Sequence, residues 1–451
     1  MEATPVLSEP ESTPQGIQSL PLELICAIFS VLHTSSTRKA QKMAPVHTLT
    51  RVCRFWREIS QGLPELWTDI RIFHCRPGHP NMLGEYLRRS NLLPIDILLQ
   101  VSSDVAANQM AEFWSAILGI WAVSARWRTL HIITTAKNFS AMKYNVGRKD
   151  APLLESLELR VSKSQSSYQP SLSFGSMPLL RSLVVHEIAP QISDTADFVG
   201  QLETLDLFGA STCTHLVVDL AQHFEDSSQD TQVIPRLRHL SLRSGLPSLY
   251  GAFGVAFKSY ISFLTTLRMG NFRDHNFQTL CSLLSTPFLE ELTLHDLTHA
   301  CWTTFTGTLR DQHLTFPALR TLKLSSITQC SFHRHLIDAF PALEHLSLLD
   351  TASPTFFSAL SKPESPSYPI LWPHLRSLAL DNADYRALCI VVEARSAMGH
   401  SVDILQVDTP QFIDAVSLQW LQKHVKTLKR NPRRPLDSTT SVLDATSLAH
   451  S

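Results

Sequence analysis

Histidine and cysteine side chains gather in one short segment and could bind a metal. His295 and His299 are four positions apart, and Cys301 follows two positions later. That spacing suits zinc when the histidines share one face of a helix. Here His295 directly follows a strand-like apolar run, and the apolar Leu297 separates the pair. We therefore expect a surface turn without metal, and the same for His333 and His335.

Other kinds of chemistry leave no motif in the chain. It contains no G-x-S-x-G, H-E-x-x-H or Walker phosphate-loop sequence. Glycine, on which phosphate-binding loops depend, is scarce, with 15 in 451 residues. Ser, His and Asp are so common that accidental triads carry no weight. We expect a protein that is not an enzyme and holds no cofactor.

Bulk composition narrows the class of partner and the compartment. The net charge is -1, so no overall field recruits nucleic acid or an anionic membrane. The acidic, Pro-rich N-terminus has no apolar run and is not a signal peptide, and no stretch of about 18 apolar residues predicts a membrane span. The scattered cysteines form no C-x-x-C pair. These features favour a cytoplasmic or nuclear protein with reduced thiols.

A basic run near the C-terminus, residues 423–435, allows three interpretations. The sequence "KHVKTLKRNPRRP" could be a nuclear-import signal, a phosphate-binding patch, or a solvated last helix and tail. We favour the last of these, because solvated charge is the commonest reason for such a run.

The elements that would position any functional residue come from a repeated phrase, Pro-x-Leu-x-x-Leu-x-Leu. It begins at Pro152, Pro178, Pro235, Pro287, Pro317, Pro341 and Pro373. Its first Leu-type position recurs about every 28 residues from Leu154 to Val402, within the range of leucine-rich repeats. The Leu-x-Leu alternation predicts a short strand with one buried face, and the apolar stretches between strands have helical spacing.

The repeats therefore predict an α/β fold, a leucine-rich-repeat (horseshoe) solenoid with a parallel sheet backed by helices. The expected strands are 157–159, 183–185, 205–207, 240–242, 267–269, 292–294, 322–324, 346–348, 378–380 and 405–407. Trp127-x-x-Leu130-x-Ile132 and Trp67-x-x-Ile70-x-Ile72 have the same spacing earlier in the chain. Residues 105–124 predict an amphipathic helix packed on the sheet.

The domain organisation follows from these patterns. We expect disordered tails at 1–16 and 431–451, a small helical module at 17–62, a strand-and-helix region at 63–126 that joins the array, and irregular repeats at 127–430. In the module, Ile25, Ile28, Phe29 and Leu32 predict one helical face, and Leu49, Val52, Cys53 and Trp56 predict a second.

The helical module resembles the F-box-like domain of large protein families in mushroom-forming fungi, which pair it with irregular leucine-rich repeats. The resemblance rests on "LPLELICAIFSVL" from Leu20, "LTRVCRFWREIS" from Leu49 and "LPELWTDIRI" from Leu63. It implies an F-box that binds a Skp-type adaptor, which docks on a cullin scaffold. Carried over to this chain, the adaptor-binding residues are Leu20, Pro21, Glu23, Ile28, Val52, Cys53 and Trp56. The spacer from His33 to Thr48 looks longer than in compact F-boxes.

The residues themselves also predict a binding module. About 45 residues cannot bury all of their apolar surface alone, so the surplus must meet either a partner or the chain's own repeats.

The repeats would then bind a protein substrate on their concave face. The residues that flank the buried leucines carry charges of both signs, which excludes a simple nucleic-acid stripe. Exposed aromatic and Arg side chains are the usual anchors, so we expect Phe208, Arg243 and Arg268 to bind the substrate.

The function expected from these features is substrate recognition within a Skp–cullin–F-box ubiquitin ligase. The alternative is a leucine-rich-repeat scaffold that binds proteins without any role in ubiquitylation.

Overall fold

The computed structural model describes most of the chain between residues 20 and 431. The described residues are 20–37, 45–73, 79–101, 105–106, 109–139, 149–162, 171–187, 189–192, 198, 200–209, 236–243, 261–272, 277, 281, 284, 286–327, 334–349, 360, 372–381, 385–408 and 415–431. The tails predicted at 1–16 and 431–451 lie outside this part, apart from Asn431, which ends the last strand.

The N-terminal module consists of short helices around a small core. They are α1 (Leu22–Thr37), α2 (Pro45–Val52), α3 (Arg54–Gly62) and the 3-10 turn η2 (Pro64–Trp67). Ile25, Phe29 and His33 line the buried face of α1 at four-residue intervals. The indole of Trp67 closes the module by donating from Nε1 to the carbonyl of Ser60 at 2.8 Å.

The second predicted helical face is divided between two helices, which corrects the expectation of one continuous helix. Cys53 has an extended backbone (φ -155°, ψ 174°), so α2 ends before it and α3 begins after it. Its thiol accepts a hydrogen bond from the backbone N–H of Trp56 at 3.4 Å, as an N-cap side chain does. Val52 and Trp56 therefore lie on different helices.

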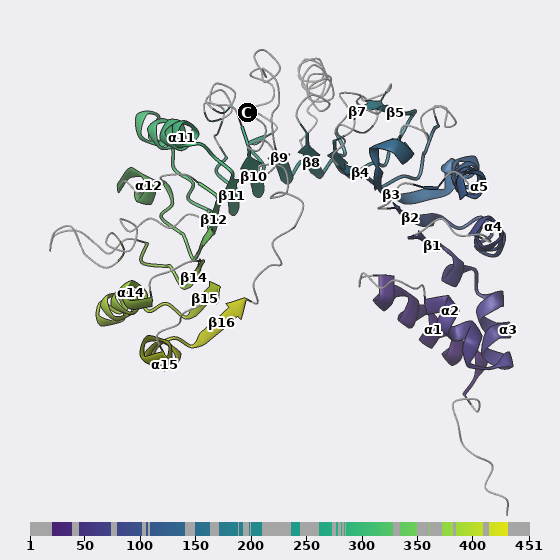
Figure 1. Ribbon diagram of the computed structural model, residues 1–451, viewed down its shortest axis with the longest axis horizontal. Coiled ribbons are helices and arrows are strands. Elements are labelled where there is room, and N and C mark those ends of the chain that lie inside the picture. The colour runs from purple at the N-terminus through teal and green to yellow at the C-terminus, as the bar shows by residue number, and fades with distance from the viewer. Residues whose placement is uncertain are drawn as a thin grey trace, which may run out of the picture.

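Within the described residues, a parallel sheet of 14 strands follows the module and curves into an open arch (Figure 1). Its strands, in spatial order, are β1 (Asp69–Ile72), β2 (Ile95–Val101), β3 (Trp127–Thr135), β4 (Ser156–Ser162), β6 (Ser182–His186), β8 (Thr204–Phe208), β9 (His239–Arg243), β10 (Thr266–Gly270), β11 (Glu291–His295), β12 (Thr321–Ser325), β13 (His345–Leu349), β14 (Ser377–Leu380), β15 (Ile404–Asp408) and β16 (Thr427–Asn431). A separate pair is formed by β5 (Ser171–Phe174) and β7 (Ala189–Ile192).

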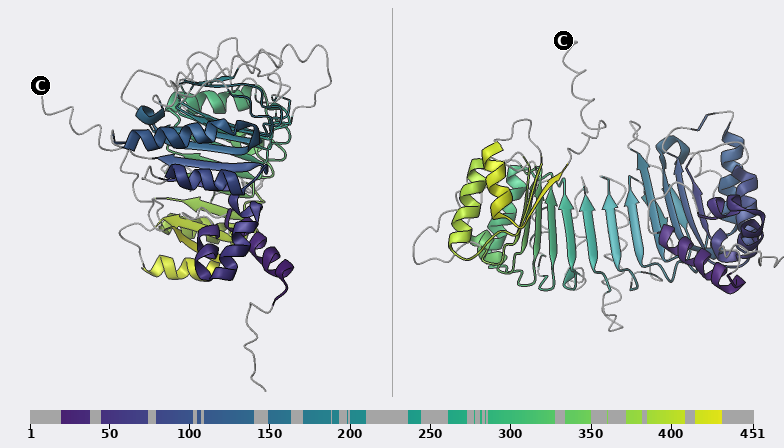
Figure 2. Two further views of the ribbon diagram at one scale, coloured as in Figure 1. Left: turned by 90° about the vertical axis from the view of Figure 1, so that its right-hand side faces the viewer. Right: turned by 90° about the horizontal axis from the view of Figure 1, so that it is seen from below.

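Helices cover the outer face of the arch and leave the inner face to the strands (Figure 1). They are α4 (His79–Arg89), α5 (Met110–Ala122), α11 (His299–Asp311), α12 (Arg334–Ala339), α14 (Tyr385–Ala397) and α15 (Ala415–His424). The helix predicted at 105–124 is confirmed as α5, which buries Phe113, Ile117 and Trp121. Figure 2 shows the strands side by side along the array. The predicted fold class, a helical module followed by an α/β solenoid, is confirmed.

The leucines of the repeated phrase form buried rows across the sheet. Leu292, Leu322 and Leu346 are register partners on β11, β12 and β13, and all three are buried. All ten strands predicted from the phrase lie inside observed strands. The proline that opens most phrases sits in a turn: Leu289, for example, donates from its N–H to the carbonyl of Thr286, so Pro287 takes the second turn position, where its fixed φ fits.

The first strand of the sheet, β1, lies in the Trp67-x-x-Ile70-x-Ile72 segment that has the repeat spacing. β2 lies in the same strand-and-helix region, 63–126, and both strands belong to the same parallel sheet as the repeats. β2 was not predicted, although Ile95, Ile97, Leu99 and Val101 alternate along it and are buried.

The sheet ends later than expected. The basic run was interpreted as a solvated helix and tail, yet Thr427–Asn431 forms β16 and pairs with β15. The basic run can form a strand because its side chains alternate between the two faces. Leu428 packs against the core, while the charged Lys429 stays exposed.

Candidate functional site

The N-terminal module exposes more apolar surface than its size requires. Leu24, Ile28 and Val31 lie beside the buried face of α1, and Leu24 and Val31 are 52% and 65% exposed. The exposed large apolar side chains of the module are Leu22, Leu24, Ile28, Val31, Leu32, Val52 and Phe55. These side chains do not pack on the chain's own repeats, as one expectation had allowed. Clustered apolar exposure in a small module marks an interaction surface.

The residues expected to bind an adaptor divide into two groups. Pro21, Glu23, Ile28 and Val52 are exposed. Leu20, Cys53 and Trp56 are half-buried: Leu20 and Trp56 pack on the core, and the Trp56 ring meets the Phe29 ring edge-on at 4.9 Å.

Sequence reasoning missed Leu22, Leu24, Val31, Leu32 and Phe55 as exposed members of this surface. Leu24, Ile28 and Val31 follow an i, i+4, i+7 spacing beside the core face, and that spacing was the available signal.

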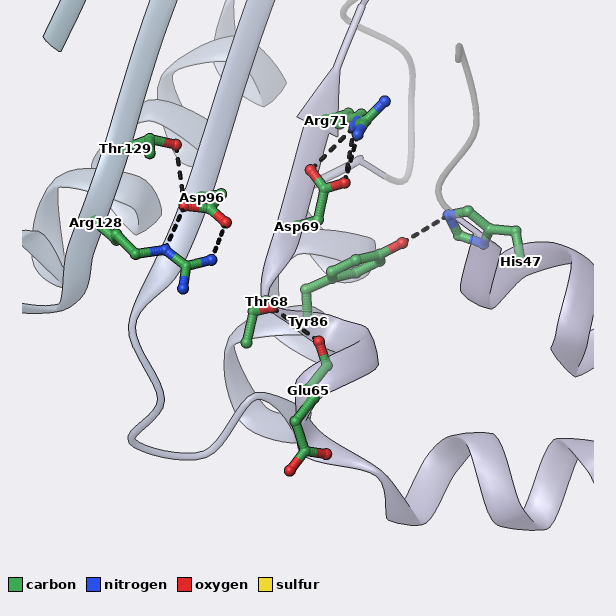
Figure 3. A network of polar contacts seen from close by, with 9 residues as sticks. All are labelled: His47, Glu65, Thr68, Asp69, Arg71, Tyr86, Asp96, Arg128 and Thr129. Atoms are coloured by element: carbon green, nitrogen blue, oxygen red, sulfur yellow. Dashed lines mark hydrogen bonds and ion pairs between the residues drawn. The ribbon is translucent and has the colours of Figure 1, made fainter. Parts of the chain in front are cut away.

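Polar and aromatic contacts join the module to the first repeat, and Figure 3 shows the polar ones. Tyr86 on α4 lies with its hydroxyl 2.9 Å from Nε2 of His47 on α2. The Tyr86 ring also meets the Trp67 ring edge-on at 5.0 Å. Burial and the nearby Arg51 lower the pKa of His47, so it is neutral at pH 7. These contacts hold the module against the sheet.

Ion pairs continue this junction into the sheet (Figure 3). On β1, Arg71 Nε lies 2.9 Å from both carboxylate oxygens of Asp69, and Arg71 Nη2 lies 2.6 Å from Oδ2 of Asp69. Asp96 on β2 pairs with Arg128 and accepts from the Thr129 hydroxyl at 3.1 Å. Both carboxylates therefore meet donors on the sheet itself.

The concave face brings two of the expected substrate-binding residues together. Phe208 and Arg243 are register partners on β8 and β9, and the Arg243 guanidinium lies 5.5 Å from the centre of the Phe208 ring. Nη2 of Arg243 is 2.9 Å from Oδ2 of Asp206, and the His186 ring is 5.5 Å from that of Phe208. An aromatic ring, a guanidinium, an imidazole and a carboxylate thus form one cluster.

The electrostatics of this cluster keep its carboxylate ionised. Burial opposes the charge on Asp206, but the hydrogen bond from His186 and the charge of Arg243 outweigh it and lower its pKa to about 2. On β4, burial likewise opposes the charge on Glu158, yet His131 at 3.0 Å and the ion pair with Arg160 lower its pKa.

The third expected residue, Arg268, lies on β10, the strand next to Arg243. Its side chain is 53% exposed, and its Nη2 is 3.4 Å from Oε1 of Glu291. The same oxygen accepts from Nζ of Lys323 at 2.9 Å. Arg268 is therefore on the concave face, one strand away from the Phe208–Arg243 cluster.

Residues 17–72 of this chain match the F-box-like family model. The matched segment holds the exposed apolar surface described above and extends beyond residue 62, through β1. It is called the F-box-like module below.

Two further comparisons add little. A search of curated proteins finds no match. The crystal structure of a TLR13–ssRNA13 complex is 13% identical, with the similarity covering 75% of this chain and 54% of that chain at a TM-score of 0.31. A TM-score this low carries no argument, and this chain spans about half the length of that protein.

The histidines and the cysteine that could have bound a metal are dispersed by the fold. His295 ends β11, His299 begins α11, and Cys301 is buried with its thiol 3.6 Å from the carbonyl of Phe272. His335 lies on α12, and His333 is outside the described residues. No group of three or more potential ligands comes together within the described part of the chain.

Among the described helices, none has the length and apolar character needed to cross a bilayer.

Proposed function

We propose that this protein is the substrate-recognition subunit of a Skp–cullin–F-box ubiquitin ligase. In this role the F-box-like module binds a Skp-type adaptor, the adaptor docks on a cullin, and the solenoid binds a protein substrate. The observation that carries the proposal is the exposed apolar face of α1 within the segment that matches the F-box-like model. The repeat style, close to irregular leucine-rich repeats of fungal F-box proteins, supports the same role.

The junction between module and sheet supports a role in presenting a substrate. Contacts among His47, Trp67 and Tyr86 link the adaptor-binding surface to the first strands without a long linker. A substrate on the concave face would therefore be held at a defined position relative to the cullin.

We expect no catalysis by the chain itself. A general acid or base needs a pKa near the working pH. Glu158 and Asp206 on the concave face have lowered pKa values and are paired with cations, so both stay ionised at pH 7. Reduced cysteines and mixed charge favour a cytoplasmic or nuclear protein that binds neither nucleic acid nor membrane.

Co-purification of the full chain with a Skp-type adaptor tests the adaptor role. Ile28→Glu/Val52→Glu places two carboxylates on the exposed apolar surface and should weaken adaptor binding at least about 30-fold, because each buried apolar anchor contributes roughly 2 kcal/mol. This pair tests the interface more specifically than Leu20→Ala, because Leu20 also packs on the core and its truncation would affect folding as well. The matched control is Leu92→Glu, an 83% exposed apolar residue outside the module.

Two results would count against the proposal. If the double variant binds the adaptor with wild-type affinity, Ile28 and Val52 are not part of the interface. No adaptor on the wild-type chain would favour the alternative, a protein-binding scaffold without a role in ubiquitylation. Under that alternative, deletion of the gene leaves the half-life of every partner unchanged.

A further inference from the structure

One stretch of the concave face has more positive charge than its carboxylates can pair. Arg268 on β10 and Lys323 on β12 both interact with a single oxygen, Oε1 of Glu291 on the strand between them. Their side chains are 53% and 45% exposed. Two cations share one carboxylate, so one positive charge is left over at this place.

The neighbouring part of the same face is balanced. On β4, Glu158 pairs with Arg160, and across β8 and β9, Asp206 pairs with Arg243. Each of these cations has a carboxylate of its own. The excess at β10–β12 is therefore a local feature and does not come from the overall charge of the protein.

The residues around the two cations offer donors and no second carboxylate. Thr293 is the register partner of both Arg268 and Lys323, so it lies between them. Its hydroxyl oxygen is buried and has no hydrogen-bond partner within the described part of the chain. The other inward-facing positions of β10, β12 and β13 are Thr266, Gly270, Thr321, Ser325, His345, Ser347 and Leu349.

We infer that this stretch, Arg268, Thr293 and Lys323, binds an acidic segment of the protein substrate through Asp or Glu carboxylates. A carboxylate placed between the two cations supplies the missing negative charge. The inference rests on the proposed function, because it assumes that the substrate binds on the concave face, and it adds the chemistry that this face selects.

An excess of one positive charge at Arg268 and Lys323 favours a short acidic segment over a nucleic acid as the ligand. Nucleic-acid binding relies on many phosphate contacts at once. A long polyanion on this face would also run across Glu158 and Asp206, which are ionised. Arg268 Nη2 and Lys323 Nζ lie 3.4 Å and 2.9 Å from the same oxygen of Glu291, so their charged ends converge and a single carboxylate of a peptide can contact both.

Fluorescence anisotropy with the full chain tests the inference. The probe is a labelled peptide of about twelve residues in which Glu alternates with Ser, compared with the same peptide carrying Gln in place of Glu. Arg268→Gln/Lys323→Gln should weaken binding of the Glu peptide about tenfold, since each exposed pair contributes modestly. Glu291→Gln should tighten it about threefold, because both cations are released from their shared carboxylate. Added salt should weaken the wild-type interaction by screening.

The control variant is Lys429→Gln, which removes an exposed cation from β16 and should leave binding unchanged. Weaker or unaltered binding in Glu291→Gln overturns the inference, as does equal affinity for the Gln peptide. A phosphoserine peptide without Glu that binds more tightly than the Glu peptide reassigns the site to phosphorylated substrates. If only a chain that lacks residues 1–16 binds the probe, the chain's own Glu2, Glu9 and Glu11 occupy the site, and the assignment to a substrate fails.

A second measurement separates this inference from the proposed function. Substrates captured by proximity labelling are compared between the wild type and Phe208→Ala/Arg243→Gln, which alters the neighbouring cluster. If Phe208→Ala/Arg243→Gln loses a substrate while the wild-type chain does not bind the Glu peptide, the concave face still binds substrates. Only the inference of an acidic segment then fails. If substrates are still captured when both the Phe208–Arg243 pair and the Arg268–Lys323 pair are changed, the concave face is not the binding surface.

Discussion

Arg243 lies over the ring of Phe208, with its guanidinium carbon 5.5 Å from the ring centre, and its Nη2 is 2.9 Å from the Asp206 carboxylate. A cation over an aromatic face is attracted by the ring quadrupole. The ring and the carboxylate together hold the guanidinium in one orientation. The concave face thus presents a fixed planar group at the boundary between β8 and β9.

Acid stability should depend on Asp206. Its folded-state pKa of about 2 is below its ordinary value of 3.8, so its stabilising contribution is present above about pH 4 and disappears as the pH falls through 2. We expect this contribution to be about 2 kcal/mol in the wild type. Urea unfolding at stepped pH should show that Asp206→Asn loses less stability than the wild type between pH 4 and 2. Parallel losses in the two proteins would assign acid sensitivity to other groups.

Buried and exposed positions of one strand should respond very differently to truncation. Leu322 is fully buried in mid-array, and Leu322→Ala should cost about 2–5 kcal/mol through lost transfer energy and a cavity. Lys323→Ala removes only a partly exposed ion pair and should cost less than about 1 kcal/mol. Equilibrium unfolding in urea compares the two. A larger effect of Lys323→Ala would contradict the register described for β12.

Gly270 should be needed because of His295. A Cβ atom at position 270 would lie 2.2–2.4 Å from the His295 ring, which covers the glycine from the adjacent strand. Gly270→Ala should therefore destabilise the protein by about 1–3 kcal/mol through overpacking. In a His295→Ala background the same change should be nearly neutral. Thermal or urea unfolding of the wild type, the two single variants and the double variant gives the coupling free energy between Gly270 and His295. A value near zero would mean that the His295 ring moves aside at no cost.

Charges alternate in sign along the N-terminal edge of the strands. Backbone hydrogen bonds place Arg320 between Glu290 and Glu344, and Arg320 pairs with Glu344 at 2.9 Å. The positions that precede successive strands from β4 to β15 are Glu155, Arg181, Glu203, Arg238, Thr265, Glu290, Arg320, Glu344, Arg376 and Asp403. Each charge thus has opposite charges as neighbours, except beside Thr265.

Reversal of one charge in this row should cause repulsion with the neighbouring charges on both sides. Arg320→Glu places three carboxylates in succession and should cost about 1 kcal/mol at low salt, with the loss shrinking as salt rises. The control is Arg310→Glu on α11, which is exposed and pairs with its neighbour Asp311. Urea unfolding at two salt concentrations measures both. A salt-independent loss in Arg320→Glu would point to packing and not to charge.

Most of the sheet could be predicted from local pattern. Side chains in a strand alternate between two faces, so Leu-x-Leu identifies both the strand and its buried face without any knowledge of neighbours. The same rule indicated that Phe208, Arg243 and Arg268 face inward, and the register agrees. Their role in binding a substrate stays a prediction. β2 was missed because its alternation lacks the Pro-x-Leu opening, and β16 because charge was weighted above the Val425-x-x-Leu428 spacing.

The amino-acid sequence by itself determined the repeat, the buried rows of leucine and the helical module, because periodicity is a property of the chain alone. Only the tertiary structure decided which polar side chains meet. Repeats of unequal length bring Asp206 to Arg243 and Glu291 to both Arg268 and Lys323, and these meetings depend on backbone register between strands far apart in sequence. Tertiary packing likewise left Leu24 and Val31 exposed, since a helix has two sides and the core covers one of them.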